Sequence, residues 1–289
     1  MFRFDTPHRR AARLLLPALL ASAFVLPHQA QAQPAAVTAS PSGPSYADLV
    51  ELTEAADLVV KAQVRKQAEV KRERAPGLAA GHARLYLEAD TQALIAGTVP
   101  VGERLRYLVD VPLDRRGRVP KLRKASVILF AKPVAGRPGE LQLVDPSAQF
   151  PATPELEARL RPVVVATLSP DKPPVVTGIA DVLSIPGNLA GESETQLFLR
   201  TASGDPASIT VIRRPGQPPR WGVSWSELVD QSARAPTPQT LEWQRLACGL
   251  PDMLPPDANL ARNPAAQRQA AEDYQLVRRE LGPCGRTRN

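Results

Sequence analysis

Six basic residues fall within a ten-residue stretch of the chain, residues 115–124, which contains no acidic residue. Basic side chains gathered in this way attract acidic partners through their summed field. The residues that we expect to bind are Arg116, Arg118, Lys121 and Arg123. The structural alternative is a solvated loop between two strands.

A second basic group surrounds a proline-rich segment near residue 217 and leads into a tryptophan. Its members are Arg214, Arg220 and Trp221. Arginine beside tryptophan is typical of interaction hot spots, which makes this group a second candidate binding site. The alternative is a tryptophan that enters a strand and packs in the core.

The chain has two cysteines, Cys248 and Cys284, which could form a redox pair, a metal site or a disulfide. Redox pairs usually lie two residues apart, and a structural zinc ion needs four ligands, so neither pattern fits. In an oxidising compartment such a pair forms a disulfide. We therefore predict a structural Cys248–Cys284 disulfide and no metal site.

The sequence contains no intact catalytic or cofactor motif, so we predict no catalytic residue and no cofactor. After removal of residues 1–32 the chain retains a single histidine, His82, in a glycine-rich loop. Ser169 and Lys172 match the S-x-x-K spacing of penicillin-binding proteins, which must open a helix. Pro173 and Pro174 follow immediately and prevent that helix.

The first 32 residues have the layout of a secretory signal peptide. Four arginines flank an uncharged run of 13 residues, 14–26, which ends before the small-residue cleavage site Ala30-Gln31-Ala32. The run is shorter than the roughly 20 residues that span a bilayer. We predict cleavage after Ala32 and a periplasmic protein with no transmembrane segment after cleavage. The Arg9-Arg10 pair leaves the twin-arginine route open beside the general secretory route.

Cleavage after Ala32 removes four Arg and one Asp, so the formal net charge falls from +7 to +4. That charge is mildly basic and well below what is typical of nucleic-acid-binding domains. We therefore expect no nucleic-acid partner. An acidic envelope component or another periplasmic protein is the expected partner.

Hydrophobic periodicity predicts a mainly β protein, a β-rich α+β fold. A short helix capped by Ser45 and Asp48 precedes five strands, at residues 58–65, 84–89, 105–111, 127–131 and 141–143. We interpret residues 33–44 as a disordered leader and 45–150 as a small antiparallel OB-like barrel or sandwich.

Residues 151–289 are predicted to be a second β-rich region with a C-terminal helical pair. A helix starts at Thr153-Pro154 and is kinked or ended at Pro162. Four strands follow, at residues 175–185, 195–201, 208–213 and 220–225. The two final helices open at Thr237-Pro238 and at Asn263-Pro264, and the second stops at Gly282.

Several segments resemble exported proteins of sphingomonad-type alphaproteobacteria that have no assigned activity. The segments are residues 56–62 (ADLVVKA), 129–131 (LFA), 191–201 (GESETQLFLRT), 214–216 (RPG), 219–221 (PRW), 229–230 (VD) and 243–248 (WQRLAC). The resemblance implies localisation and lineage, and it transfers no functional residue.

These observations together favour a non-enzymatic protein of the cell envelope that binds or scaffolds a partner. The alternative is a periplasmic hydrolase whose Ser, Lys and carboxylate residues are assembled by the fold.

Overall fold

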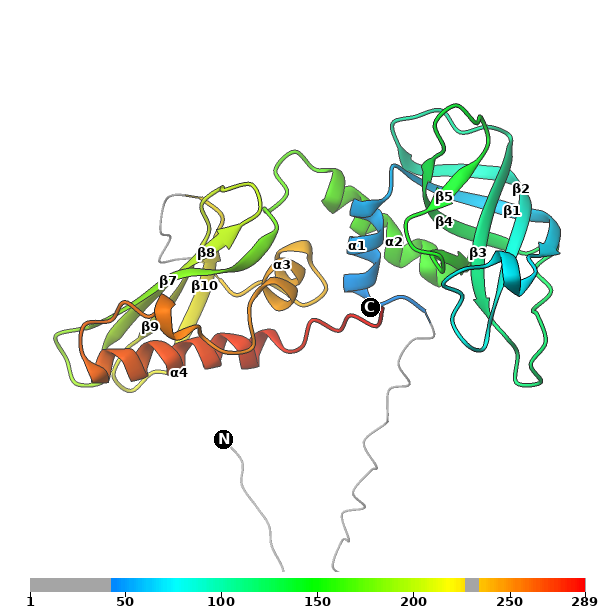
Figure 1. Cartoon of the computed structure of the whole chain (residues 1–289). Coiled ribbons are helices and arrows are strands. Elements are labelled where there is room, and N and C mark those ends of the chain that lie inside the picture. Colours follow the sequence, from blue (N-terminus) through cyan, green and yellow to red (C-terminus); the bar gives the residue numbers. More distant parts are fainter. Residues whose placement is uncertain (1–42, 227–233, 289) are drawn as a thin grey trace, which may run out of the picture. The chain divides into compact units, whose positions relative to one another are not determined.

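The computed structural model describes residues 43–226 and 234–288. Within these ranges the chain is a β-rich α+β protein, with ten strands in two antiparallel sheets and four α-helices (Figure 1). This confirms the predicted fold class. The predicted signal peptide, its cleavage site and most of the leader lie outside the described residues. No helix in the described ranges is long and apolar enough to cross a membrane.

Helix α1 (Tyr46–Ala55) begins at the predicted capping box. The Asp48 backbone N–H donates to Ser45 Oγ at 3.1 Å, and the Ser45 N–H donates to the Asp48 carboxylate at 2.8 Å. The helix buries Leu49, Val50 and Leu52 in the first hydrophobic core. One side of α1 is therefore apolar and fixed against the first sheet.

The first sheet has the strand order β3-β2-β1-β4-β5, with β6 also paired to β4. The strands are β1 (Leu58–Glu69), β2 (His82–Gly97), β3 (Arg104–Pro112), β4 (Ser126–Pro133), β5 (Leu141–Leu143) and β6 (Gln149–Pro151). Alternate residues are buried in residues 60–64 of β1, in residues 83–89 of β2 and along β3, as the period of two predicts.

The outer strands β3 and β5 approach each other because the sheet curls. A parallel bridge joins Arg106 to Glu140. The Arg106 N–H donates to Gly139 O at 2.8 Å, and the Asp110 N–H donates to Pro146 O at 2.7 Å. Only glycine suits position 139, where φ is +78° and a Cβ would lie 2.7 Å from the Arg104 carbonyl oxygen. Among residues 43–226 no continuous ladder joins the two edges, so the first sheet is not a closed barrel, and the two sheets fit the predicted sandwich alternative.

Helix α2 (Pro154–Leu168) is capped by Thr153 and completes the first core with Leu156, Leu160 and Val163. Of the two predicted alternatives, a kink or an end at Pro162, the structure excludes the end, since α2 continues for six residues beyond the proline. Pro162 lies on the exposed side of the helix. Burial of Leu160 before the proline and of Val163 and Val164 after it supports the helix.

The second sheet has the order β10-β9-β8-β7. Its strands are β7 (Val176–Pro186), β8 (Ser193–Thr201), β9 (Ser208–Arg213) and β10 (Arg220–Ser224). The predicted hairpin is confirmed, because β8 and β9 pair antiparallel. Helix α4 (Pro264–Leu281) runs along this sheet (Figure 1) and buries Tyr274 and Val277 in the second core.

The C-terminal helical pair is confirmed, with one corrected boundary. Helix α3 (Leu241–Gly249) begins after Thr240, and not at Thr237-Pro238. The Thr240 hydroxyl accepts the Trp243 N–H and donates to Thr237 O, which gives the helix its N-cap three residues later than predicted. Cys248 and Cys284 form the predicted disulfide, and no cysteine is free.

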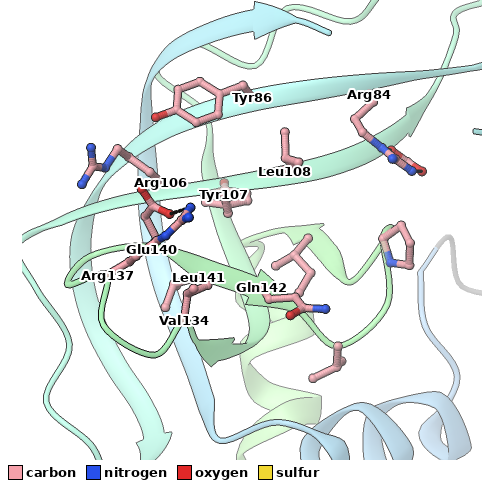
Figure 2. A pocket seen from close by; sticks show the side chains of 14 residues that line it. Arg84, Tyr86, Arg106, Tyr107, Leu108, Val134, Arg137, Glu140, Leu141 and Gln142 are labelled. Atoms are coloured by element: carbon pink, nitrogen blue, oxygen red, sulfur yellow. Dashed lines mark hydrogen bonds and ion pairs between the residues drawn. The ribbon is translucent and has the colours of Figure 1, made fainter. Parts of the chain in front are cut away.

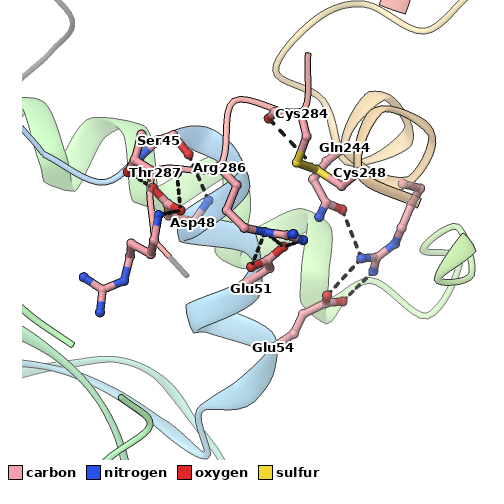
Figure 3. Close-up of polar contacts among 11 residues, drawn as sticks. Ser45, Asp48, Glu51, Glu54, Gln244, Cys248, Cys284, Arg286 and Thr287 are labelled. Carbon is pink, nitrogen blue, oxygen red and sulfur yellow. Dashed lines mark hydrogen bonds and ion pairs between the residues drawn. A yellow bond between two sulfur atoms is a disulfide. The ribbon is translucent and has the colours of Figure 1, made fainter. Parts of the chain in front are cut away.

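Three acidic side chains of α1 bind residues on either side of this disulfide (Figure 3). We call Asp48, Glu51 and Glu54 the α1 acid row. Both Glu54 oxygens accept hydrogen bonds from Arg245, whose side chain is 3% exposed. Glu51 accepts a forked hydrogen bond from Arg286.

The third member of the row, Asp48, accepts the backbone N–H groups of Thr287 at 3.1 Å and Arg288 at 3.2 Å. Burial raises the pKa of Asp48, but hydrogen bonds from Thr287 and Ser45 outweigh burial and leave this pKa below its ordinary value. Asp48 is thus held as a carboxylate at neutral pH.

The two arginines of this contact should respond differently to loss of their glutamates. Glu54→Ala leaves the buried guanidinium of Arg245 without its counter-ion, and we expect it to lower the free energy of unfolding by about 3 kcal/mol. Glu51→Ala removes the partner of Arg286, which is already half-exposed to solvent. We therefore expect the free energy of unfolding to fall by about 1 kcal/mol or less. Urea unfolding of the two variants and the parent measures both values. Equal losses would contradict the assignment of the buried ion pair as the stronger contact.

Candidate functional site

The outward face of β2 and β3 forms one side of a groove (Figure 2). Cross-strand pairs on this face are Arg84 with Asp110, Tyr86 with Leu108, and Glu88 with Arg106. Each pair brings two side chains within contact distance on the same face. The face therefore presents a polar pair, an apolar pair and a second polar pair in succession.

The opposite side of the groove comes from the β4–β5 connection and the segment after β5. We call the cavity the β3–β5 groove. Its lining from this side is Val134, Arg137, Glu140, Leu141, Gln142, Leu143, Val144 and Pro146. The cavity has a volume of about 620 Å³, within the range typical of small-ligand sites.

Arg84 and Asp110 fix one end of the groove. The guanidinium donates from Nε to Asp110 Oδ1 at 2.7 Å and from Nη2 to Oδ2 at 2.8 Å. The side chains are only 17% and 11% exposed. The hydrogen bonds that Arg84 donates to Asp110 raise the pKa of Arg84 above its ordinary value. Such a forked, partly buried pair is a rigid part of the wall.

Arg106 is the cation of the groove that has no acidic partner among the described residues. Its cross-strand neighbour Glu88 instead binds Lys66 at 2.8 Å. Arg137, on the opposite side of the groove, is 3.3 Å from Glu140. The exposed guanidinium of Arg106 is therefore free to donate to an anionic ligand, and its geometry suits a carboxylate or a phosphate.

An apolar surface lies next to this guanidinium. Tyr86 and Leu108 face each other across β2 and β3, and they are 37% and 47% exposed. Large apolar side chains paired at a cavity mouth can cover the non-polar part of a ligand. The groove thus combines one unpaired positive charge with an apolar patch.

The loop after β5 forms the end wall of the groove through Val144 and Pro146. Asp145, between them, accepts the N–H of Ser147 at 2.8 Å and its hydroxyl at 2.6 Å. Burial raises the pKa of Asp145, but the bonds from Ser147 and the charge of Arg288 outweigh burial and lower it. The loop is therefore built around an ionised carboxylate.

The structure places the first predicted binding group in the exposed loop between β3 and β4, outside the groove lining. Asp114 accepts the backbone N–H groups of Arg116 and Arg118 and the Arg118 guanidinium. These bonds, the one from the Arg118 backbone first, lower the pKa of Asp114. Lys121 and Arg123 are exposed. Their binding role stays a prediction.

The second predicted group is divided by the structure. Arg214 pairs with Glu192 at 2.7 Å, and Arg220 is exposed at the start of β10. Trp221 is buried in the second core, and its Nε1–H donates to Glu280 of α4 at 2.6 Å. Packing and this hydrogen bond account for Trp221, so the candidate site excludes it.

The loop histidine and the S-x-x-K residues lie in ordinary structural positions. His82 begins β2, with its Nδ1 3.0 Å from Ala80 O. Ser169 ends α2, and the Lys172 ammonium donates to Thr167 O at 3.0 Å. In the described part of the chain no group of three or more His, Cys, Asp or Glu is placed to hold a metal ion.

Sequence reasoning missed the groove because its residues look like the polar half of two ordinary strands. The available signal was the alternation of Arg84, Tyr86 and Glu88 with buried residues, matched by Arg106 and Leu108 on the next strand. Pairing these residues requires the register of the two strands, and the far wall requires the curl of the sheet.

No protein-family model matches this chain, and no curated protein is detectably similar to it in sequence.

Proposed function

We propose that this chain is an exported, non-enzymatic binding protein of the cell envelope and that the β3–β5 groove is its ligand site. The observation that carries the proposal is the exposed, unpaired Arg106 beside the apolar pair Tyr86 and Leu108, at the mouth of a cavity of about 620 Å³. Convergent polar and apolar groups at a cavity of this size are typical of binding sites.

The ligand that fits is a phosphorylated amphiphile of the envelope. A phosphate matches the fork of the Arg106 guanidinium. The apolar part of the ligand would lie against Tyr86 and Leu108. Lipopolysaccharide and anionic phospholipid share this chemistry.

Binding is favoured over hydrolysis by the state of the groove's carboxylates. Asp110 is held by Arg84, and Glu140 is held by Arg137. Each carboxylate thus orients an arginine instead of standing free as a general acid or base.

Export is supported by the charge and hydropathy layout of residues 1–32 and by the Cys248–Cys284 disulfide, which an oxidising compartment maintains. We expect the protein in the periplasmic fraction to begin at Gln33. N-terminal sequencing or intact mass of that fraction measures the cleavage point. Recovery of the uncleaved chain from the cytosol would contradict export.

Arg106→Ala should weaken binding of the phosphorylated ligand by about tenfold to a hundredfold, because a charge-assisted hydrogen bond of about 1.5–3 kcal/mol is lost. The matched control is Arg104→Ala, since Arg104 is exposed on the same strand but does not line the groove. Affinity is measured for purified lipopolysaccharide and, separately, for phosphatidylglycerol vesicles, with phosphatidylcholine vesicles as the neutral reference.

Comparison of lipopolysaccharide with phosphatidylglycerol identifies the source of the phosphate. A third variant tests the loop between β3 and β4, and it changes four basic residues together to Ser: Arg116, Arg118, Lys121 and Arg123. We expect this variant to flatten the salt dependence of binding. We expect it to lower affinity less than Arg106→Ala does. Loss of binding in the loop variant with full binding in Arg106→Ala would move the site from the groove to the loop.

A further inference from the structure

We propose that the last described residues of the chain hold the end wall of the β3–β5 groove in place, and that Arg288 is the positioning residue. We call residues 285–288 the C-terminal strap. The inference rests on the proposed function in one respect only, namely that the groove is the ligand site. The contacts of the strap with the wall are independent of that function.

The strap is anchored at its start. Cys284 is bonded to Cys248 of α3, so the strap leaves from a fixed point. Arg286 then binds Glu51 by a forked hydrogen bond. Thr287 donates its N–H and its hydroxyl to Asp48. A terminal segment with this many contacts is tied down, whereas most chain ends are not.

The far end of the strap lies against the wall loop. The Arg288 guanidinium donates to Asp145 Oδ1 and, at 2.8 Å, to Ser147 Oγ. The central carbon of this guanidinium, Cζ, lies 5.3 Å from the centre of the Phe150 ring, which is a cation–π distance. Arg288 therefore contacts the loop at its first turn and at the strand that follows.

The wall loop passes this contact to the groove by backbone bonds. Val144 and Pro146, on either side of Asp145, line the cavity. The Pro146 carbonyl accepts the Asp110 N–H at 2.7 Å, and the Asp110 carboxylate holds Arg84. A chain of bonded groups thus runs from the strap to the rigid end of the groove.

The strap determines where the wall loop lies, whereas hydrogen bonds within the loop determine its shape. Asp145 closes the local turn through two bonds from Ser147, and neither bond needs Arg288. What Arg288 adds is a tie between this turn and α1, through the backbone bond of Arg288 to Asp48. Loss of Arg288 should therefore loosen the wall without unfolding the sheet.

The test compares Arg288→Ala, Arg288→Lys and Arg268→Ala in the full mature chain. Arg268 is an exposed arginine of α4 without an ion pair among the described residues, which makes it the matched control. The first measurement is amide hydrogen exchange without ligand. In Arg288→Ala the amide hydrogens of residues 144–150 and of Asp110 should exchange about tenfold faster, while exchange in peptides of β7–β10 stays unchanged. Arg288→Lys, which keeps the charge, should restore part of the protection.

The second measurement is affinity for purified lipopolysaccharide and for phosphatidylglycerol vesicles. We expect Arg288→Ala to lower the affinity for the probe that binds about threefold to tenfold, mainly through faster dissociation. Arg288→Lys should recover part of this loss. Arg268→Ala should match the parent in both measurements.

The outcomes separate the two proposals. Unchanged exchange at residues 144–150 in Arg288→Ala overturns the strap. Faster exchange with unchanged affinity, while Arg106→Ala loses binding, overturns the strap's link to the ligand and leaves the groove intact. If neither probe binds the parent chain, the proposed function fails, and the exchange measurement alone decides whether the strap holds the wall.

Discussion

The acid row of α1 is the contact on which the arrangement of the chain depends. Asp48, Glu51 and Glu54 lie three residues apart, so they share one side of the helix while the apolar side enters the first core. Their partners are 191 to 240 residues away along the chain. The disulfide brings those partners together, because Arg245 precedes Cys248 by three residues and Arg286 follows Cys284 by two. One short helix thereby binds residues next to both cysteines of the disulfide.

Local sequence signals predicted the elements well. Hydrophobic patterns placed nine of the ten described strands and missed the three-residue β6, and the Ser45–Asp48 and Asn263-Pro264 signals placed the starts of α1 and α4. These features depend on neighbours within a few residues, which a sequence displays directly. The disulfide was predictable because the chain offers one pairing. Pro162 left a kink or an end of the helix as alternatives, and burial of residues on both sides of it keeps α2 continuous.

The groove could not be predicted in the same way, because it depends on contacts that the sequence leaves implicit. The backbones of Arg106 and Glu140 form a bridge only when the sheet curls, and that close approach needs the glycine at position 139. Charge density pointed elsewhere, to residues 115–124, where the arginines are exposed or bound to Asp114. Arg106 stands apart for a different reason, namely that Lys66 occupies Glu88, the acid opposite it. Which cation is available to a ligand follows from pairing, and pairing follows from register.

The strap shows how individually weak contacts can order a chain end. Its ion pairs are partly exposed, with Arg286 46% and Arg288 22% accessible, and such pairs contribute about 1 kcal/mol or less each. Attachment at Cys284 changes this balance, because a tethered segment meets its partners at a high effective concentration. Four residues beyond the sulfur, Arg288 reaches Asp145 without a long search. The disulfide is therefore more than a link between α3 and the end of α4, since it makes the contacts of the strap favourable and, through them, supports the wall of the groove.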